Sequence, residues 1–477
     1  MSIIRDILPV EFKTEMKTLL GDEYSDFISS YDENKTNSIR INTLKIAVDE
    51  FKKLSLFNID YSYGSDDSIG WSDEGYYVSE DENPGKCYLH DAGAYYIQEP
   101  SAMSVVGNTE IKEGEKILDL CAAPGGKSTY ILSKLNGTGI LFSNEINTTR
   151  IKALGENLER FGAINSIITN SSSKELLKFF KGYFDKVFID APCSGQGMFR
   201  KDEYAIKDWS VQKVDECVEI QKYLIRDGYE MLKPNGILIY STCTFTRREN
   251  EDIVDDFIRE SGAELLAMDR IWPHKDRGEG HFCARLMKSV KLDDASDKVT
   301  NGYLQASRLK NRKKGSKNGK CQNQYENISK NDEKLFLDFL NQSIGADSSF
   351  FRILGNGKIV KKNTLLYFYP KEFDDVPELK AVKILRAGLQ LGELKKNRFE
   401  PSHSLAMALK TSDVKHFESF GHDSEEIMKF ISGESIQSGK SRGWVLIAVN
   451  DVSIGWCKES GGVLKNKYPK GLRKIIK

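Results

Sequence analysis

Several features of membrane, secreted and zinc-binding proteins are missing from this sequence. No stretch approaches the ~20 apolar residues that a membrane helix needs. The first residues, MSIIRDILPVEF, lack a long apolar run followed by small residues, so we expect no signal peptide. The eight cysteines include no C-x-x-C pair, which argues against a structural zinc site. We therefore expect a cytoplasmic protein with reduced thiols, no membrane contact and no metal.

A strong net charge is also missing. The 69 Lys and Arg residues balance 70 Asp and Glu residues, which leaves a formal charge of −1. This total does not indicate nucleic acid, although balanced totals can hide local patches. One segment, RLKNRKKGSKNGK at residues 308–320, is strongly basic and contains no acid. It fits either a solvated linker or a segment that follows RNA phosphates, and both can hold at once.

The middle of the chain alternates short apolar runs with amphipathic segments such as residues 149–161 and 211–232. The runs expected to be buried strands are KILDL (116–120), GILFSNE (139–145), SIITN (166–170), DKVFIDAP (185–192) and GILIYST (236–242). This alternation predicts an α/β fold with a doubly wound, mostly parallel sheet. Such sheets bind ligands at the carboxyl ends of their strands.

The chain of 477 residues is too long for one core. Near the N-terminus, Leu8, Phe12 and Met16 have helical spacing, SIRINTLK at 38–45 alternates like a strand, and acid-rich residues 65–83 are expected to form a surface loop. After the core, a polar basic stretch precedes renewed apolar periodicity, which indicates small α+β domains. We expect four parts: an α+β extension at 1–105, the core at 106–290, a linker at 291–330 and a C-terminal region at 331–477.

A glycine-rich segment, DLCAAPGGKST at residues 119–129, follows the first expected strand. Its small residues allow close approach of a ligand, and the N–H donors of the next helix favour a polar or anionic group. A P-loop is excluded because Cys121 replaces its first glycine and Pro124 lacks a donor. Glu145 ends the next strand, where it can accept both ribose hydroxyl protons. The strand after it ends at Ser172, where an adenine amine could be read, although no acid is present.

Two cysteines follow the ends of two further buried strands. Cys193 lies in DAPCSGQG (190–197), and Cys243 lies in STCT (241–244). A buried cysteine is usually a small apolar side chain, but one beside polar residues at a ligand edge is more often reactive. A thiolate that adds to C6 of cytosine places electron density on C5, which is otherwise a poor nucleophile towards a methyl sulfonium. Asp190 is positioned to carry charge near N3 and the exocyclic amine.

These motifs resemble the NOL1/NOP2/Sun family of RNA cytosine-5 methyltransferases. The matching segments are HDAGAYYIQEPSAM (90–103), LDLCAAPGGKS (118–128), FIDAPCSGQGMFRKD (188–202), IYSTCTFTRRENE (239–251) and the Asn144-Glu145 strand end. The resemblance implies a Rossmann-like core that uses S-adenosylmethionine, with Cys243 as nucleophile and Cys193 assisting product release.

The same resemblance implies a set of cofactor contacts: Cys121, Ala122, Ala123, Pro124, Gly125, Gly126, Lys127, Glu145 and Asp190. Lys127 and Asp190 join the two cysteines as expected catalytic residues. The chain departs from the family at two places. Asn170 and Ser172 stand where the family commonly has an acid, and Arg247-Arg248 stands where it usually has a proline. The two arginines either contact RNA or are solvated.

Residues 443–473 resemble the RNA-binding tail of bacterial small-subunit rRNA methyltransferases of the RsmF type, which implies a PUA-like module. Aromatic residues interleaved with cations suit stacking on bases and contacts with phosphates. The implied substrate is 16S rRNA or the small ribosomal subunit, and nothing demands more than a monomer. Two alternatives are a tRNA cytosine-5 methyltransferase and a catalytically silent RNA-binding assembly factor. The intact Cys193, Cys243, Asp190 and Lys127 argue against the second.

Overall fold

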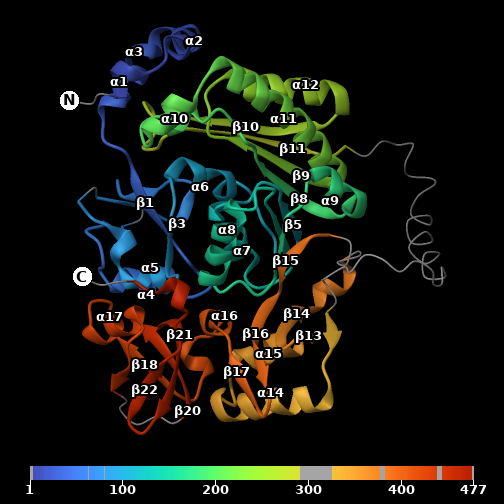
Figure 1. The fold of residues 1–477 in the computed structure, drawn as a ribbon. Coiled ribbons are helices and arrows are strands. Elements are labelled where there is room, and N and C mark those ends of the chain that lie inside the picture. Colours follow the sequence, from blue (N-terminus) through green and yellow to red (C-terminus); the bar gives the residue numbers. More distant parts are fainter. Residues whose placement is uncertain are drawn as a thin grey trace, which may run out of the picture.

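The computed structural model describes residues 4–62, 64–79, 81–289, 325–376, 382–437 and 443–474 (Figure 1). The basic segment at 308–320 and most of the expected linker lie outside these residues. Within the described ranges, no helix is long and apolar enough to cross a membrane.

The central sheet carries the fold, and its eight strands have the order β10-β11-β9-β8-β5-β6-β7-β15. The strands are β5 (Lys116–Asp119), β6 (Ile140–Asn144), β7 (Ser166–Thr169), β8 (Phe184–Asp190), β9 (Leu232–Thr242), β10 (Glu264–Ile271), β11 (His281–Met287) and β15 (Ile384–Ala387). Strands β5 to β9 pair in parallel, which confirms the expected α/β core. The apolar runs were recognisable because both faces of this sheet are covered.

Helices cover the two faces of the sheet. Their bounds are α6 (Pro100–Gly107), α7 (Gly126–Leu135), α8 (Arg150–Arg160), α9 (Ser173–Phe180), α10 (Glu203–Asp208), α11 (Val211–Met231) and α12 (Glu251–Ser261). Helices α6, α7 and α8 pack against the face that carries Ile117 and Leu141. Helices α9, α11 and α12 pack against the opposite face, which carries Leu118 and Phe142. Neighbouring residues of one strand thus serve two cores, as the pleat requires.

The N-terminal extension contains a helical part and a four-stranded sheet. Its elements are α1 (Ile4–Ile7), α2 (Val10–Leu20), α3 (Tyr24–Ser29), β1 (Asn37–Ile41), α4 (Val48–Lys53), β2 (Ser68–Ile69), β3 (Ser72–Val78), α5 (Tyr88–Asp91) and β4 (Tyr95–Ile97). The sheet order is β2-β3-β1-β4. Phe12 and Met16 of α2 are buried with Phe27 against Phe199 and Trp209 of the core. The helical spacing therefore predicted the correct buried face.

The expected surface loop at residues 65–83 is wrong, because this stretch holds β2 and β3. Strand β3 pairs with β1, and Tyr76, Tyr77 and Val78 are buried. Its acid Glu74 is also buried, and it accepts a hydrogen bond of 2.9 Å from Tyr130 Oη and pairs with Lys134 Nζ at 2.7 Å. A buried carboxylate needs such partners, and the partners come from a helix 60 residues away in the chain.

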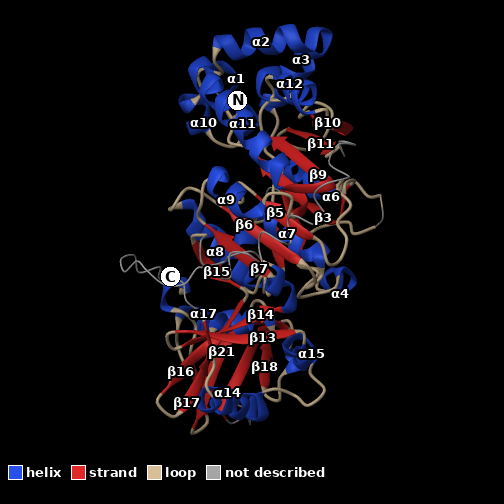
Figure 2. Cartoon of the chain, turned by 90° about the vertical axis from the view of Figure 1, so that its right-hand side faces the viewer, coloured by secondary structure: helices blue, strands red, loops and turns tan. Residues whose placement is uncertain are grey.

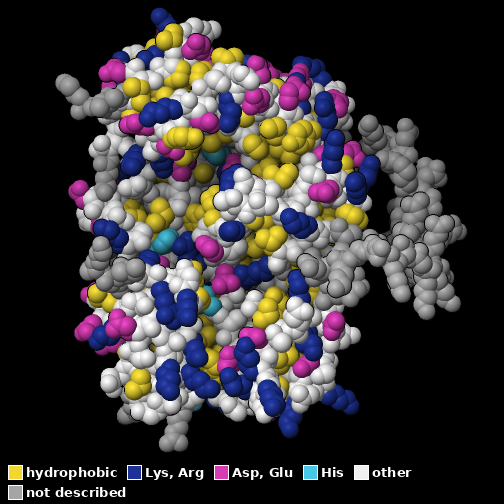
Figure 3. All heavy atoms as spheres, in the orientation of Figure 1, with side chains coloured by type: hydrophobic (Ala, Val, Ile, Leu, Met, Phe, Trp, Pro, Cys, Tyr) yellow, Lys and Arg dark blue, Asp and Glu magenta, His cyan; other side chains and the backbone are white. Residues whose placement is uncertain are grey.

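The C-terminal region forms two small α+β units, as expected. The first contains β12 (Glu326–Asn327), α14 (Lys330–Ser343), α15 (Ser349–Gly355), β13 (Gly357–Lys362), β14 (Leu365–Pro370), β16 (Leu389–Lys395), β17 (Arg398–Pro401) and α16 (His403–Ala408). The second contains β18 (Phe417–Phe420), α17 (Glu425–Ser432), β19 (Ile436–Gln437), β20 (Gly443–Val449), β21 (Val452–Ser460) and β22 (Val463–Asn466). Lys and Arg side chains gather over the lower part of the molecule, where these units lie (Figure 3).

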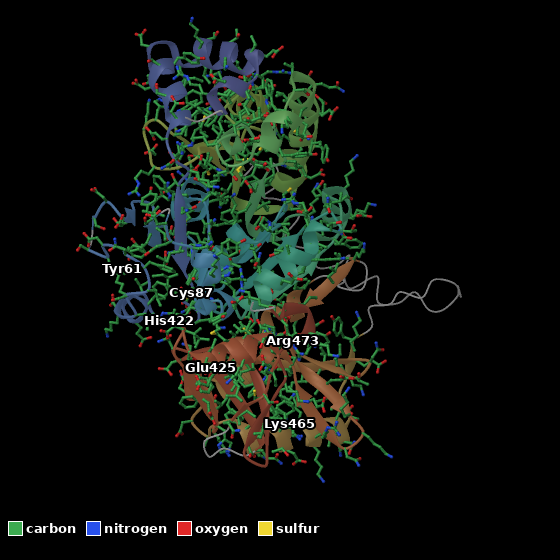
Figure 4. The ribbon with its side chains drawn as sticks, turned by 60° about the vertical axis from the view of Figure 1, so that its left-hand side comes forward. Tyr61, Cys87, His422, Glu425, Lys465 and Arg473 are labelled. Carbon is green, nitrogen blue, oxygen red and sulfur yellow. The ribbon has the colours of Figure 1, made fainter. Side chains whose placement is uncertain are left out.

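Two long-range connections were not expected from the sequence. Strand β15, which precedes β16 in the C-terminal region, extends the core sheet antiparallel to β7. The N-terminal sheet and the last unit also share one apolar core, in which Tyr95 is buried together with Phe430 and Ile454. Figure 4 labels Cys87 of the extension and His422 of the last unit where these two parts of the chain meet. Figure 2 shows the core between the N-terminal helices and the C-terminal sheets.

Candidate active site

The glycine-rich loop lies at the carboxyl end of β5, in the middle of the parallel strands. Its backbone is fixed by Ala122 N–H, which donates to the carbonyl of Asn144 at 2.8 Å. Gly125 has a φ of +113°, and a Cβ there would lie 3.3 Å from Leu154 Cδ1. Helix α7 begins at the next residue, Gly126. The loop therefore presents a close backbone and free helical N–H donors to the ligand edge.

Glu145 stands at the same edge, directly after β6. Its side chain is 4% exposed, and Arg150 Nη1 lies 3.6 Å from Oε2. Oε1 accepts a hydrogen bond of 2.8 Å from the backbone N–H of Asn147. Oε2 has no hydrogen-bond partner among the described residues. A buried carboxylate oxygen in this state is costly unless a ligand supplies a donor, and ribose hydroxyls are such donors. The residues present therefore fit the ribose of S-adenosylmethionine.

Asn144 holds the strand ends of this edge together through hydrogen bonds. The sequence predicted only that it ends a strand. Its amide donates to the carbonyls of Leu120 at 3.1 Å and Ser171 at 3.0 Å. Its oxygen accepts from Thr169 Oγ1 at 2.8 Å and from Ser171 N–H at 3.1 Å. One buried side chain thus ties the ends of β5, β6 and β7 together.

Ser172 is engaged within the chain as the N-cap of α9. Its hydroxyl donates to Glu175 Oε2 at 3.0 Å, and the Ser172 N–H donates to the same oxygen at 2.8 Å. These hydrogen bonds lower the pKa of Glu175, whose side chain stays exposed. The neighbouring Asn170 bonds to Lys383, just before β15. The structure therefore places an ionised acid at this strand end, three residues after the position that the sequence suggested.

The structure brings the two predicted thiols to one point. Cys193 follows β8 and Cys243 follows β9, and these strands are parallel neighbours. The two Sγ atoms lie 3.3 Å apart, and both side chains are half-buried. The hydrogen bond between the thiols and burial together raise the pKa of Cys193 well above its usual value. Both sulfurs can thus reach one small reacting group.

Lys127 and Asp190 form an ion pair beside the thiols, with 2.8 Å between Nζ and Oδ2. Burial alone would lower the pKa of Lys127, but the Asp190 carboxylate outweighs it, so the pKa is raised. Burial alone would raise the pKa of Asp190, but Lys127 and the Ser241 hydroxyl, which donates at 3.1 Å, hold it below its usual value. His281 Nε2 lies 3.7 Å from Asp190 Oδ1, and burial lowers the pKa of that imidazole to about 3. The pair is therefore charged next to a neutral histidine.

Glu249 connects the two cysteine loops, and sequence reasoning did not single it out. This fully buried carboxylate accepts hydrogen bonds of 2.9 Å from Ser194 N–H and from Gln221 Nε2, and it also accepts from the Ser194 hydroxyl. Ser194 Oγ in turn lies 2.9 Å from Thr244 Oγ1. Burial raises the pKa of Glu249. Glu249 thus holds Ser194 directly and Thr244 through the Ser194 hydroxyl.

Replacing Glu249 with glutamine should disturb both loops at once. The new amide would point donors at the donors of Ser194 or Gln221, and each buried donor left unpaired costs about 1–3 kcal/mol. We expect a melting temperature several degrees lower and catalytic activity reduced about tenfold, measured by calorimetry and an activity assay. Glu216→Gln, on the exposed side of α11, is the matched control. Equal behaviour of the two variants would contradict this role for Glu249.

The arginines after Cys243 are both solvent-exposed and both paired. Arg247 Nη2 lies 3.7 Å from Asp252 Oδ1, and Arg248 forms an ion pair with Asp215. Exposed pairs of this kind contribute little to stability, so either side chain is free to exchange its partner for a phosphate. The geometry is compatible with both interpretations of these residues.

The parallel sheet, the glycine-rich loop and the acid after the second core strand define an S-adenosylmethionine-dependent methyltransferase. The 16S rRNA methyltransferase RsmB/F family matches residues 108–287. Three further families match the flanking parts: the N-terminal domain of 16S rRNA methyltransferase RsmF at 8–100, the first C-terminal domain of RsmF at 340–409 and the RsmF PUA domain at 417–474.

Curated relatives cover almost the whole chain. The ribosomal RNA small subunit methyltransferase F of Vibrio vulnificus is 31% identical over 98% of this chain and 97% of its own length. The protein of the same name from Erwinia tasmaniensis is 30% identical over 98% and 97%. The chain therefore belongs to the RsmF family of methyltransferases, and this family is part of the NOL1/NOP2/Sun group.

Solved structures support the fold of more than half of the chain. A methyltransferase homologue from Pyrococcus horikoshii is 26% identical, with a TM-score of 0.52, over 60% of this chain and 98% of that chain. The NSun6 protein of the same organism, solved with SFG, is 21% identical with a TM-score of 0.51, over 59% and 99%. The second likeness shows a shared fold only.

Proposed function

We propose that this methyltransferase acts on carbon 5 of a cytosine in 16S rRNA through a covalent bond between Cys243 and C6. The observation that carries the proposal is the pair of thiols 3.3 Å apart at the ligand edge of the sheet. The charged pair of Lys127 and Asp190 lies beside them. Methyl transfer to oxygen, or to an amine that is already nucleophilic, has no need of a thiol.

In the proposed reaction the Cys243 thiolate adds to C6 and makes C5 nucleophilic. S-adenosylmethionine supplies the methyl group when it is bound. A base then removes the proton from C5, and elimination breaks the bond between sulfur and C6. Cys193 assists this last step, which its position next to Cys243 supports. The target base must leave its stack, because C6 is shielded inside a helix.

The ionised state of Asp190 refines the role expected for it. A carboxylate can accept hydrogen bonds from the exocyclic amine and from a proton held at N3, which stabilises the charge that develops during addition. Lys127 keeps that carboxylate ionised and oriented through their 2.8 Å contact. The two residues therefore act as one unit at the edge of the base that carries N3 and the amine.

The choice of rRNA rests on the relatives. Their printed name is ribosomal RNA small subunit methyltransferase F, and they match this chain from end to end. The matched PUA family and the N-terminal family support RNA-binding roles for residues 331–477 and for the 1–105 extension. A tRNA target would use the same core chemistry, so the substrate needs its own test.

The test uses total RNA and ribosomal subunits from a strain that lacks this gene. Purified protein and methyl-labelled cofactor are added, and the labelled nucleoside and its parent RNA are identified after digestion. We expect 5-methylcytidine from 16S rRNA. Label in tRNA would overturn the substrate, and label in another nucleoside would overturn the reaction. Cofactor binding without transfer to any RNA would support the assembly-factor alternative.

Glu145→Gln should weaken binding of the cofactor rather than slow the methyl-transfer step. The substitution removes the charge from a buried acceptor, and one charged hydrogen bond contributes about 1.5–3 kcal/mol. We expect the Kd for S-adenosylhomocysteine to rise at least about tenfold, as measured by calorimetry. Glu156→Gln, on the exposed face of α8, should leave the Kd unchanged. An unchanged Kd in Glu145→Gln would remove Glu145 from the cofactor site.

A further inference from the structure

A polar cavity of about 410 Å³ lies between the N-terminal extension and the core. Its walls are residues 33–37, which lead into β1, and residues 273–278, just before β11, together with Val78, Ser79 and Arg200. Thr36 N–H donates a hydrogen bond of 3.1 Å to Oε1 of Glu279, the residue that follows the second segment. The volume of the cavity falls in the range of roughly 300–1,000 Å³ that is typical of ligand sites.

The topology puts this cavity at the catalytic edge. Strand β11 runs antiparallel to β9 with Phe282 opposite Thr242, so the residues before β11 lie next to Cys243. A Cβ added at Gly197 would be 3.0 Å from the carbonyl oxygens of both Cys243 and Gly280. The backbone just beyond the cavity wall, at Gly280, and that of the nucleophile therefore flank the same glycine.

The Cys193 loop also reaches the cavity, through Arg200. Arg200 Nε donates to Glu279 Oε2 at 2.7 Å, and Nη1 donates to the carbonyl of Ser30 at 2.9 Å. Nη2 donates to the carbonyl of Gly278 at 3.1 Å, so the guanidinium fastens the chain after Cys193 to the second wall and to the residues just before the first. The cavity is a defined part of the folded structure, because three segments far apart in the sequence form its walls.

The cavity presents polar and cationic side chains that a ligand could engage. The His274 side chain is 4% exposed, and neither ring nitrogen has a hydrogen-bond partner among the described residues, although Nε2 lies 3.5 Å from Glu23 Oε2. Lys35 is exposed and forms no ion pair with any residue in the described part of the chain. Arg277 is exposed, and its guanidinium stacks on Tyr77 at 4.0 Å. It also donates a hydrogen bond to the carbonyl of Asp66 and lies 3.9 Å from Asp67 Oδ1, and a phosphate can replace these exposed contacts. Glu33 and Asp276 also line the cavity, so cations must be placed specifically to attract an anion.

We propose that this cavity binds a ribonucleotide next to the target cytosine in the same RNA strand, an inference that rests on the proposed function. Lys35 and Arg277 contact its phosphate, and His274 forms a hydrogen bond with its base or 2′-hydroxyl. A flipped cytosine carries its neighbours with it along the backbone, and unstacked bases are what proteins read in RNA. The cavity therefore makes the neighbour of the target part of substrate recognition.

Substitutions in the cavity test this role by separating binding from chemistry. We expect Lys35→Ala and His274→Phe each to raise the KM for RNA about five- to tenfold, which is about 1–1.4 kcal/mol. The kcat and the Kd for S-adenosylhomocysteine should stay within twofold of the wild type. Phenylalanine keeps the ring that packs on Phe27 and Trp272, and melting curves check the fold. Lys53→Ala, an exposed lysine of the same extension, is the matched control.

A cross-linking experiment locates the neighbour directly. RNA with 4-thiouridine next to the target is irradiated on the wild-type protein, and the attached peptide is identified. We expect attachment within residues 33–37 or 273–278. Attachment only elsewhere, or an unchanged KM in both variants, would overturn the proposal while the wild type still methylates RNA. If the wild type methylates no RNA, the proposed function itself fails, so the two failures are distinguishable.

Discussion

Cys243→Ala should abolish methyl transfer, with a loss of about 10⁴-fold or more, as expected when a covalent nucleophile is removed. The reason is chemical: without an addition at C6, carbon 5 has too little electron density to accept a methyl group. The alanine removes only a sulfur from a half-buried position, so the fold and the Kd for S-adenosylhomocysteine should stay unchanged. The measurement is transfer of labelled methyl groups to 16S rRNA, with cofactor binding followed by calorimetry.

A matched control separates this cysteine from others of similar exposure. Cys87 is also half-buried, but it lies in the N-terminal extension, so Cys87→Ala should keep full activity. RNA containing 5-fluorocytosine at the target should form a stable covalent complex with the wild type, because no proton can leave C5, and none with Cys243→Ala. Residual transfer near the wild-type rate in Cys243→Ala would assign the nucleophile to another group, with Cys193 the first to examine.

The sequence was sufficient to predict the core and the point where its ligands meet. Parallel strands buried on both faces are continuous apolar runs, so β5 to β9 were recognisable one by one. The strand ends of a parallel sheet meet at one edge, which brings Cys193 and Cys243 together without any knowledge of side-chain geometry. The glycine-rich loop was equally readable, because only glycine fits the positive φ of Gly125.

Features that depend on distant partners could not be predicted in this way. Glu74 looked like a surface acid until Tyr130 and Lys134 supplied its hydrogen bonds. Strand β15 is short, and its partner β7 lies more than 200 residues earlier in the chain. Nothing in the sequence near β15 therefore indicates that it belongs to the core sheet. The role of Glu249 could not be predicted either, because a single sequence does not tell a buried acid from an exposed one. In each case the missing information is a tertiary contact rather than a local preference.

Cys193→Ala should leave the enzyme covalently bound to its RNA instead of abolishing methyl transfer. The Cys243 thiolate can still add to C6 and C5 can still be methylated, but release of the product loses the neighbouring thiol at 3.3 Å. We expect a protein–RNA complex that survives denaturing gels in the presence of S-adenosylmethionine. Turnover should fall about 10²-fold or more, the scale of a lost proton-transfer group, while a single round of methylation persists.

The double variant Cys193→Ala/Cys243→Ala supplies the control for this trapping experiment. It should form no complex, because the trapped bond belongs to Cys243 in the proposed chemistry. Its cofactor affinity should match that of both single variants, since neither thiol carries the ribose contact assigned to Glu145. If Cys193→Ala turns over normally and no complex accumulates, Cys193 has no part in release. A complex in the double variant would show that the bond is made elsewhere and would reverse the assignment of the nucleophile.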